Sequence, residues 1–443
     1  MKRKYLILMM CLAPALLFAG SLTLGQLKSM ALANNPELEM ARIDHLSARE
    51  NARQFHTRRL PSLDFAGSYK YQSVVPELNI PPVDLGFGQP ITVFDKPMTL
   101  GTQDTYDFSL TLSQPLFTGF QLKNQDKSLH EMADSKELDY HRKKSELIYQ
   151  VENGYYQLLK TDMIIAISQS AKDQVEAHLK DVRHFYEQGM ARKDDVMKAE
   201  VKLSETDLSI MQAEHARATA LAALENLTGE PLQDVTLDSI VINEALPPVD
   251  LPGSLAKAYA NRLELKSLKT MQGAASSSVK AARGAYMPTV AAFGKLGYGK
   301  PGLDFINKEW MDYWVAGVSA EWSLWNWGKT SSQVQTAKLN VNRVRESINQ
   351  VEQGIKLDVT RAVLQVDETE QRMRLSEKIV SQNQETFRIV ENNYKNGMAD
   401  NSDYLDVQLD LTRARLNLAS AQVDYMIARS NLERAQGTIT DQE

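Results

Sequence analysis

Two stretches of the chain alternate between apolar and polar residues with a period of two. In SLDFAGSYKY (residues 62–71) and TYDFSLTLS (residues 105–113) nearly every second side chain is apolar, and residues 289–323 repeat the pattern. Such alternation is typical of strands with one apolar face. It predicts two β-hairpins, at about residues 62–115 and 289–323, and thus four strands in the chain.

Most of the other residues follow a helical pattern. Residues 121–187 and 329–396 contain no proline, and each run would form a helix approaching ~100 Å at ~1.5 Å per residue. In the second run apolar residues recur at steps of 4-3-4-3-4 from Ala337 to Ile355, which is the spacing of a coiled-coil seam. Shorter helices are predicted at about residues 194–228 and 402–436.

The chain is an internal duplication. At an offset of 227 residues ALANNPEL (31–38) aligns with AYANRLEL (258–265), and at an offset of 208 YEQGMARKDDV (186–196) aligns with YKNGMADNSDY (394–404). The 19 residues by which the offsets differ lie between Pro61 and Phe117, where the Pro- and Gly-rich segment 74–90 predicts a long exposed loop. Pro61 and Pro288 precede the hairpins of the two halves and mark the expected strand starts.

Gly189 and Gly397 stand at matching positions between heptad-patterned helices. Glycine there can take the left-handed conformation that ends a helix, and the Asp or Ser residues that follow can cap the next one. The sequence therefore predicts a helix-hairpin turn at each glycine.

The first residues predict export. Three basic residues at positions 2–4 and an apolar run to Phe18 form a signal peptide, residues 1–21, with cleavage near residues 19–21. Cys11, the only cysteine, is lost with it, so neither disulfides nor Cys-ligated metals are expected in the mature chain. Loss of the three basic residues takes the net charge from −6 to −9, which argues against nucleic-acid binding.

The mature chain divides at its proline-rich middle. We predict a first repeat over residues 22–230, a linker over 231–252, a second repeat over 253–438 and a tail over 439–443. No apolar stretch of about 18 residues follows the leader, so any membrane crossing would be made by strands.

Four strands leave two unpaired edges and are too few to enclose a polar lumen, so they form either a small soluble sheet or one share of a barrel pooled from several chains. The apolar face favours pooling, because aromatic residues lie near the strand ends while the opposite face carries Ser, Thr, Asp, Lys and Gly. The predicted aromatic belt at the lipid interface consists of Tyr69, Tyr71, Tyr106, Tyr298 and Trp314.

Nothing in the sequence predicts an enzyme, a cofactor or a metal site. Gly328-Lys329-Thr330 imitates the end of a phosphate-binding loop, but a Trp-rich segment precedes it, and it fits a strand-to-helix join better. Trp322, Trp325 and Trp327 are expected at the membrane interface or packed against this join. The seven histidines are scattered over predicted helices and are expected at exposed positions.

Several of these segments together resemble the TolC family of bacterial outer-membrane efflux proteins. They are ALANNPEL and AYANRLEL, the pairs Leu60-Pro61 and Met287-Pro288, the strand-to-helix joins QPLFTGF and WSLWNWG, and the two Gly turns. The resemblance covers essentially the whole mature chain. It implies a mainly α fold with a transmembrane β part, in which a homotrimer pools four strands per chain into a twelve-stranded barrel and its antiparallel coiled coils form a periplasmic tunnel.

The resemblance also implies a function. The chain would be a passive channel-tunnel of a tripartite efflux or type I secretion system, held in outer-membrane lipid with a periplasmic extension. Its partners would be a periplasmic adaptor and an inner-membrane transporter of the RND, ABC or MFS type. The alternative is a periplasmic coiled-coil scaffold or adaptor without a membrane barrel.

By the same resemblance, the helix turns close the tunnel. Asp403 and Asp406 match an acidic ring in which three chains place ~6 carboxylates around one axis, and such a ring attracts cations. Asp195 and Tyr394 match the closing network, although Asp195 and Asp403 at helix starts also fit plain capping residues. Ala399 replaces a basic residue of the family pattern, and Lys198 is a candidate substitute for the missing cation.

Overall fold

The computed structural model describes residues 23–79, 98–232 and 249–439. The predicted signal peptide, most of the Pro- and Gly-rich loop, the middle of the linker and nearly all of the tail lie outside these residues. The described chain forms two compact units, and each takes residues from both sequence halves: one contains residues 43–138 and 266–349, the other residues up to 42, 139–265 and from 350 onward. The sequence repeats are therefore not the compact units, because elements of one half pack against elements of the other in both units.

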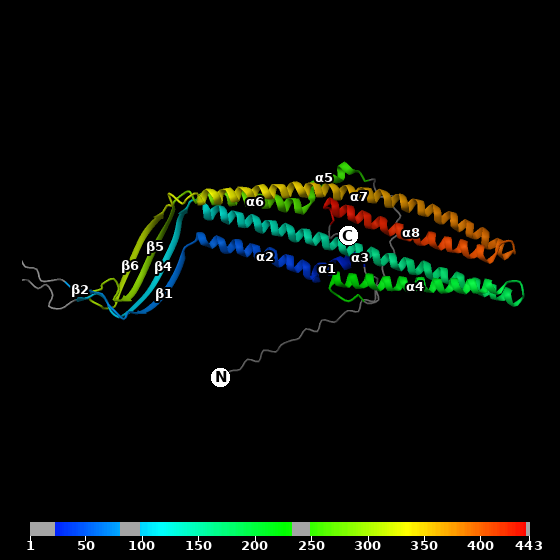
Figure 1. The fold of residues 1–443 in the computed structure, drawn as a ribbon, viewed down its shortest axis with the longest axis horizontal. Coiled ribbons are helices and arrows are strands. Elements are labelled where there is room, and N and C mark those ends of the chain that lie inside the picture. The colour runs from blue at the N-terminus through cyan, green and yellow to red at the C-terminus, as the bar shows by residue number, and fades with distance from the viewer. Residues whose placement is uncertain (1–22, 80–97, 233–248, 440–443) are drawn as a thin grey trace, which may run out of the picture. The chain divides into compact units, whose positions relative to one another are not determined.

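The first unit contains a four-stranded antiparallel sheet in the order β1-β4-β5-β6 (Figure 1). The strands are β1 (Ser62–Tyr71), β4 (Asp104–Thr118), β5 (Thr289–Lys300) and β6 (Met311–Glu321). β1 begins directly after Pro61 and β5 directly after Pro288, in line with a residue type that cannot donate to the strand ladder. The short pair β2 (Glu77–Leu78) and β3 (Met98–Thr99) extends the first hairpin.

Strand register places the predicted apolar residues on one face of the sheet. Phe65, Leu110, Leu296 and Trp314 form one continuous row across the four strands, and Leu63, Leu112, Gly294 and Ala316 form the next. The side chains of the first row are 37–74% exposed in the single chain. A continuous exposed apolar face of this kind indicates contact with lipid or with another chain.

The opposite face is less polar than the sequence predicts. Phe293 and Tyr313 lie on it, because Phe293 is opposite Gly317 and Tyr313 is opposite Gly297. A Cβ atom on Gly297 would meet the Tyr313 ring at 2.2 Å, and one on Gly317 would meet the Phe293 ring at 2.9 Å. Each ring therefore covers a glycine of the neighbouring strand, an arrangement known to protect glycine in sheets.

Each strand-to-helix join contains two successive left-handed residues. At the first join these are Gly119 (φ 57°) and Phe120 (φ 61°), and at the second they are Trp327 (φ 55°) and Gly328 (φ 81°). The pairs occupy matching positions of the duplication, with glycine and the aromatic residue exchanged. The Gly328-Lys329-Thr330 segment is thus part of a join, as the sequence predicts.

Eight α-helices complete the described residues. In the first half they are α1 (Leu24–Asn34), α2 (Pro36–His56), α3 (Gln121–Glu187) and α4 (Lys193–Thr228), with the 3-10 turn η1 (Thr57–Arg59) before β1. In the second half they are α5 (Leu251–Asn261), α6 (Leu263–Gly284), α7 (Lys329–Lys395) and α8 (Asn401–Gln436). The predicted fold class, mainly α with four long strands per chain, is confirmed.

The second unit has a core that repeats the duplication in its buried side chains. In the first half Leu147, Val151 and Leu158 of α3 pack with Leu224 of α4 and with α1. The matching residues of the second half, at the offset of 208, are Ile355, Val359, Val366 and Leu432, and they are at most 4% exposed. The same helix faces are therefore buried in both halves. Among the described helices, none has both the length and the apolar character needed to cross a membrane.

Candidate functional site at the helix turns

The turns that join α3 to α4 and α7 to α8 (Figure 1) have the same pattern of backbone hydrogen bonds. The amide of Met190 donates to the carbonyl of Phe185 at 2.8 Å and that of Gly189 to Tyr186 at 2.9 Å, and the corresponding bonds at the second turn are 2.8 and 3.0 Å. This bonding pattern ends a helix at a left-handed residue. Gly189 (φ 77°) and Gly397 (φ 73°) supply it, so the turns lie where the sequence predicts them.

Asp195 and Asp403 occupy the same place at the starts of α4 and α8. A carboxylate oxygen of Asp195 accepts the backbone N–H of Arg192 at 3.1 Å, and one of Asp403 accepts that of Asp400 at 3.2 Å. Each carboxylate satisfies a helix-terminal amide that has no partner within the helix. Both residues therefore act as caps within one chain, the plainer of the two roles that the sequence allows.

Asp406 and Lys198 line one cavity between α4 and α8. Its volume is about 450 Å³, and Met197, Val201, Leu405 and Leu409 form its apolar wall. Lys198 lies 3.6 Å from Asp194 and donates to the Ser402 hydroxyl at 3.2 Å. In the described residues no ion pair reaches Asp403 or Asp406, so within one chain Lys198 does not replace the cation missing at Ala399.

Tyr394 belongs to a buried ring cluster that the sequence does not predict. Its ring centroid lies 5.4 Å from that of Tyr404 and 5.1 Å from that of His178, which is only 4% exposed. The expectation of exposed histidines is wrong for His178. Burial, together with the negative charges of Asp195 and Asp181, raises the pKa of Tyr394, and burial raises the pKa of Tyr404 to about 12.

The predicted aromatic belt lies mostly at the loop end of the sheet. Tyr69 pairs with Tyr106 close to the end of β1, and their rings are 5.0 Å apart. Trp314 lies further in along the sheet than Tyr298. Trp310, which precedes β6 and is not part of the predicted belt, stacks on Tyr298 at 5.0 Å and lies 5.5 Å from Tyr106.

Trp322 packs at the other end of β6. Its indole N–H donates to the carbonyl of Tyr286 at 3.0 Å, so it ties β6 to the residues before β5. Trp325 and Trp327 meet edge to face at 5.7 Å, and Trp327 is 88% exposed. Aromatic residues thus mark both ends of the sheet.

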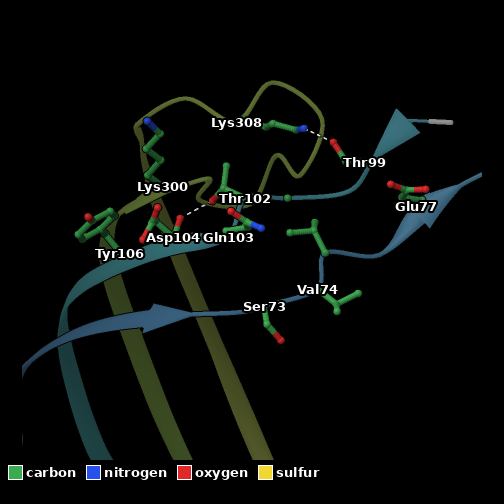
Figure 2. A pocket seen from close by; sticks show the side chains of 12 residues that line it. Ser73, Val74, Glu77, Thr99, Thr102, Gln103, Asp104, Tyr106, Lys300 and Lys308 are labelled. Carbon is green, nitrogen blue, oxygen red and sulfur yellow. Dashed lines mark hydrogen bonds between the residues drawn. The ribbon is translucent and has the colours of Figure 1, made fainter. Parts of the chain in front are cut away.

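A cavity at the loop end of the strands has a volume of about 670 Å³, and Figure 2 shows the side chains that line it. Its charged lining consists of Glu77, Asp104, Lys300 and Lys308, and Lys308 donates to the Thr99 hydroxyl. The charged lining thus contains two carboxylates and two ammonium groups, so the two signs of charge balance.

The comparisons with known proteins agree with this architecture. The model of the family described as outer membrane efflux protein matches residues 27–230 and 255–438. The outer membrane protein TolC of Escherichia coli (strain K12) is 20% identical over 95% of this chain and 83% of its own length. The alkaline protease secretion protein AprF of Pseudomonas aeruginosa is 21% identical over 76% of this chain and 71% of its own.

A solved structure shows the same fold. The outer membrane protein VceC of Vibrio cholerae superimposes with a TM-score of 0.76 at 18% identity, over 94% of this chain and 96% of that one. The family match spans both halves in order and includes both helix turns and all four long strands. The chain therefore belongs to the outer membrane efflux protein family, and it is an outer-membrane channel and not an enzyme, as its sequence predicts.

Proposed function

We propose that three copies of the chain assemble into one channel, with the sheets pooled into a twelve-stranded barrel and the long helices forming a periplasmic tunnel. The main support is the sheet itself. β1 and β6 are its outer strands, and in the described residues neither has a partner on its free side. Unpaired backbone groups cost several kcal/mol each in lipid, and strands of 10–15 residues suit a bilayer, which needs about 9–11.

Membership of this family implies an adaptor and an inner-membrane transporter as partners. We propose that the adaptor binds at the helix turns and that the transporter, of the RND, ABC or MFS type, supplies the energy. The channel itself is passive. Its relatives AprF, a protease secretion protein, and TtgC of Pseudomonas putida, named for toluene efflux, show by their names how widely cargo differs within the family.

We further propose that Asp403 and Asp406 form an acidic ring at the tunnel mouth, where Asp195, Tyr394 and Lys198 hold the turns together. Asp403 and Asp406 are at exposed positions of α8, and within the described residues neither carboxylate forms an ion pair. Within one chain the described residues contain no group of three or more His, Cys, Asp or Glu side chains that could hold a metal ion. A cation site at the mouth therefore requires several chains.

Divalent-cation block of single-channel current in planar bilayers tests the ring. The double variant Asp403→Asn with Asp406→Asn removes the charge, while the side-chain amide oxygen introduced at position 403 can still accept the helix-capping bond from the Asp400 N–H. The block by divalent cations should weaken by tenfold or more, since the substitutions remove ~6 negative charges from the tunnel mouth of the trimer. The control is Asp410→Asn, one turn further along α8 and also exposed.

If the double variant is blocked like the wild-type channel, the ring is wrong. If the purified chain is a monodisperse monomer without detergent, the trimeric channel is wrong as well.

Insertion of the sheet into lipid can be measured separately. The five tryptophans all lie within residues 310–327, so quenching of their fluorescence by brominated lipids reports insertion of the sheet alone.

A further inference from the structure

His178 of α3 joins the helices that meet at the turns. Its Nε2 lies 2.7 Å from the Asn401 side-chain oxygen, at the first residue of α8. The Asn401 amide nitrogen donates to the Asp195 carbonyl of α4 at 3.3 Å, and this fixes the Asn401 oxygen as the acceptor for His178. The Nε2 atom of His178 therefore carries a proton and donates it to Asn401. One chain of hydrogen bonds connects α3, α8 and α4.

The surroundings of His178 suit the neutral ring. It stacks on Tyr404 at a centroid distance of 4.0 Å and an angle of 17°, and Tyr394 of α7 covers it at 5.1 Å. Asn401 is 6% exposed and Tyr404 is 7% exposed. A charge placed on the imidazole would be removed from water, which is costly.

We propose that His178 is an acid-sensitive latch, and that its protonation frees the first turns of α8 from α3 and α4. A protonated ring has a second N–H to satisfy, and the hydrogen bonds around it already use the Asn401 oxygen. The charged groups that face the cluster are Asp181 on α3, Asp195 on α4 and Glu391 on α7. Of these, the negative charge of Asp181 favours the protonated ring of His178, but the effect of burial on the pKa is larger.

The direction of the pH effect follows from burial. Burial lowers the pKa of His178 below its ordinary value of 6.5, and the Asn401 hydrogen bond and Asp181 only partly oppose this. A group with a lowered folded pKa contributes stability above its unfolded pKa and loses it as pH falls through the folded pKa. The latch is therefore closed at neutral pH and opens on acidification below about pH 6.5.

Hydrogen exchange of the full-length protein in detergent tests the latch directly. Exchange at residues 401–408, corrected for its intrinsic pH dependence, should accelerate between about pH 7.5 and pH 5 by tenfold for each unit of pKa depression. In His178→Gln the response should disappear, because glutamine donates the same bond and does not titrate. His184→Gln is the matched control, since His184 is exposed on the last turn of α3 and, within the described part of the chain, its side chain bonds only to Gln188.

An acid response in His178→Gln equal to that of the wild type would overturn the latch. If that variant fails to fold, Asn401→Asp decides: a carboxylate beside His178 favours the charged ring, so the acid response should shrink or reverse, and an unchanged response would overturn the proposal. The inference rests on the proposed function only in linking this latch to closure of the tunnel. If acid accelerates hydrogen exchange but does not change the single-channel conductance, the latch at His178 is supported. Its proposed role in closing the tunnel is then rejected.

Discussion

Gly397 is required for its backbone conformation and not for space. Its φ is 73°, and a Cβ atom there would meet nothing within 4 Å. An L side chain in this conformation costs roughly 1–2 kcal/mol. We therefore expect Gly397→Ala to lower the apparent midpoint of thermal unfolding, followed by far-ultraviolet circular dichroism.

Gly354 of α7 provides the matched control. A Cβ atom there also has open space, but the residue lies inside a helix with ordinary φ. Alanine at a helix-interior glycine is favourable by roughly 0.5–1 kcal/mol, so Gly354→Ala should raise the midpoint. Equal shifts in the two variants would show that the turn conformation is not what Gly397 supplies.

The sequence predicts those residues whose role depends only on their neighbours along the chain. Gly189 and Gly397 are predictable because a left-handed helix end is written within a few residues. The burial of His178 is not, because the 67-residue helix α3 shows which face is covered only once Asn401 and Tyr404 of α8 are in place. Whether Asp403 and Asp406 form a ring depends on other copies of the chain, so it stays a prediction.

A clasp around Asp126 holds the end of α2 to the start of α3. One oxygen of this buried carboxylate accepts from Arg59 at 2.9 Å and lies 3.0 Å from His56, and the other lies 3.4 Å from His130. The matching residue of the second half is Val334, which is also buried. At the same helix position, therefore, the first half buries a charged residue with ionic partners and the second half buries an apolar residue.

Loss of the Asp126 charge should weaken this clasp at neutral pH. Burial alone would raise the pKa of Asp126, but the bonds from His56 and Arg59 outweigh it and hold the pKa below its ordinary value of 3.8. The carboxylate thus stabilises the fold above about pH 4 and loses this contribution as pH falls through the lowered pKa. We expect Asp126→Asn to cost about 1–3 kcal/mol at pH 7.

Urea midpoints measured at neutral and strongly acid pH check this prediction. The difference between wild type and Asp126→Asn should be constant around neutrality and should shrink below about pH 4. Asp134→Asn, at an exposed position two turns along α3, is the control and should leave the midpoint unchanged. A difference that persists in strong acid would mean that the amide disturbs packing and that the charge is unimportant.

Strands were predictable as elements because their period of two is visible in any one of them. The pairing of Tyr313 with Gly297 and of Phe293 with Gly317 was not, since it depends on the register between β5 and β6. This register places aromatic rings on the face that the sequence assigns to Ser, Thr, Asp, Lys and Gly. Alternation therefore predicts which residues share a face but not what covers each glycine.

At the scale of the whole molecule, the free edges of the sheet allow a direct test of pooling. In one chain β1 and β6 are separated by β4 and β5. Three strand spacings amount to about 14 Å, whereas a disulfide requires Cα atoms within about 7 Å. A disulfide between β1 and β6 can therefore form only between chains.

Cys11, the only cysteine of the sequence, lies in the predicted leader, so we expect the introduced cysteine pairs to form disulfides without competition from a native cysteine. We expect Ala66→Cys, combined in turn with Val315→Cys and Ser319→Cys, to give covalent trimers on non-reducing gels in at least one combination. The control is Ala66→Cys with Ser109→Cys, which are direct partners in β1 and β4 and should link within one chain. If all β1–β6 pairs remain monomeric while the control forms its disulfide, the outer strands do not meet, and the pooled barrel is excluded.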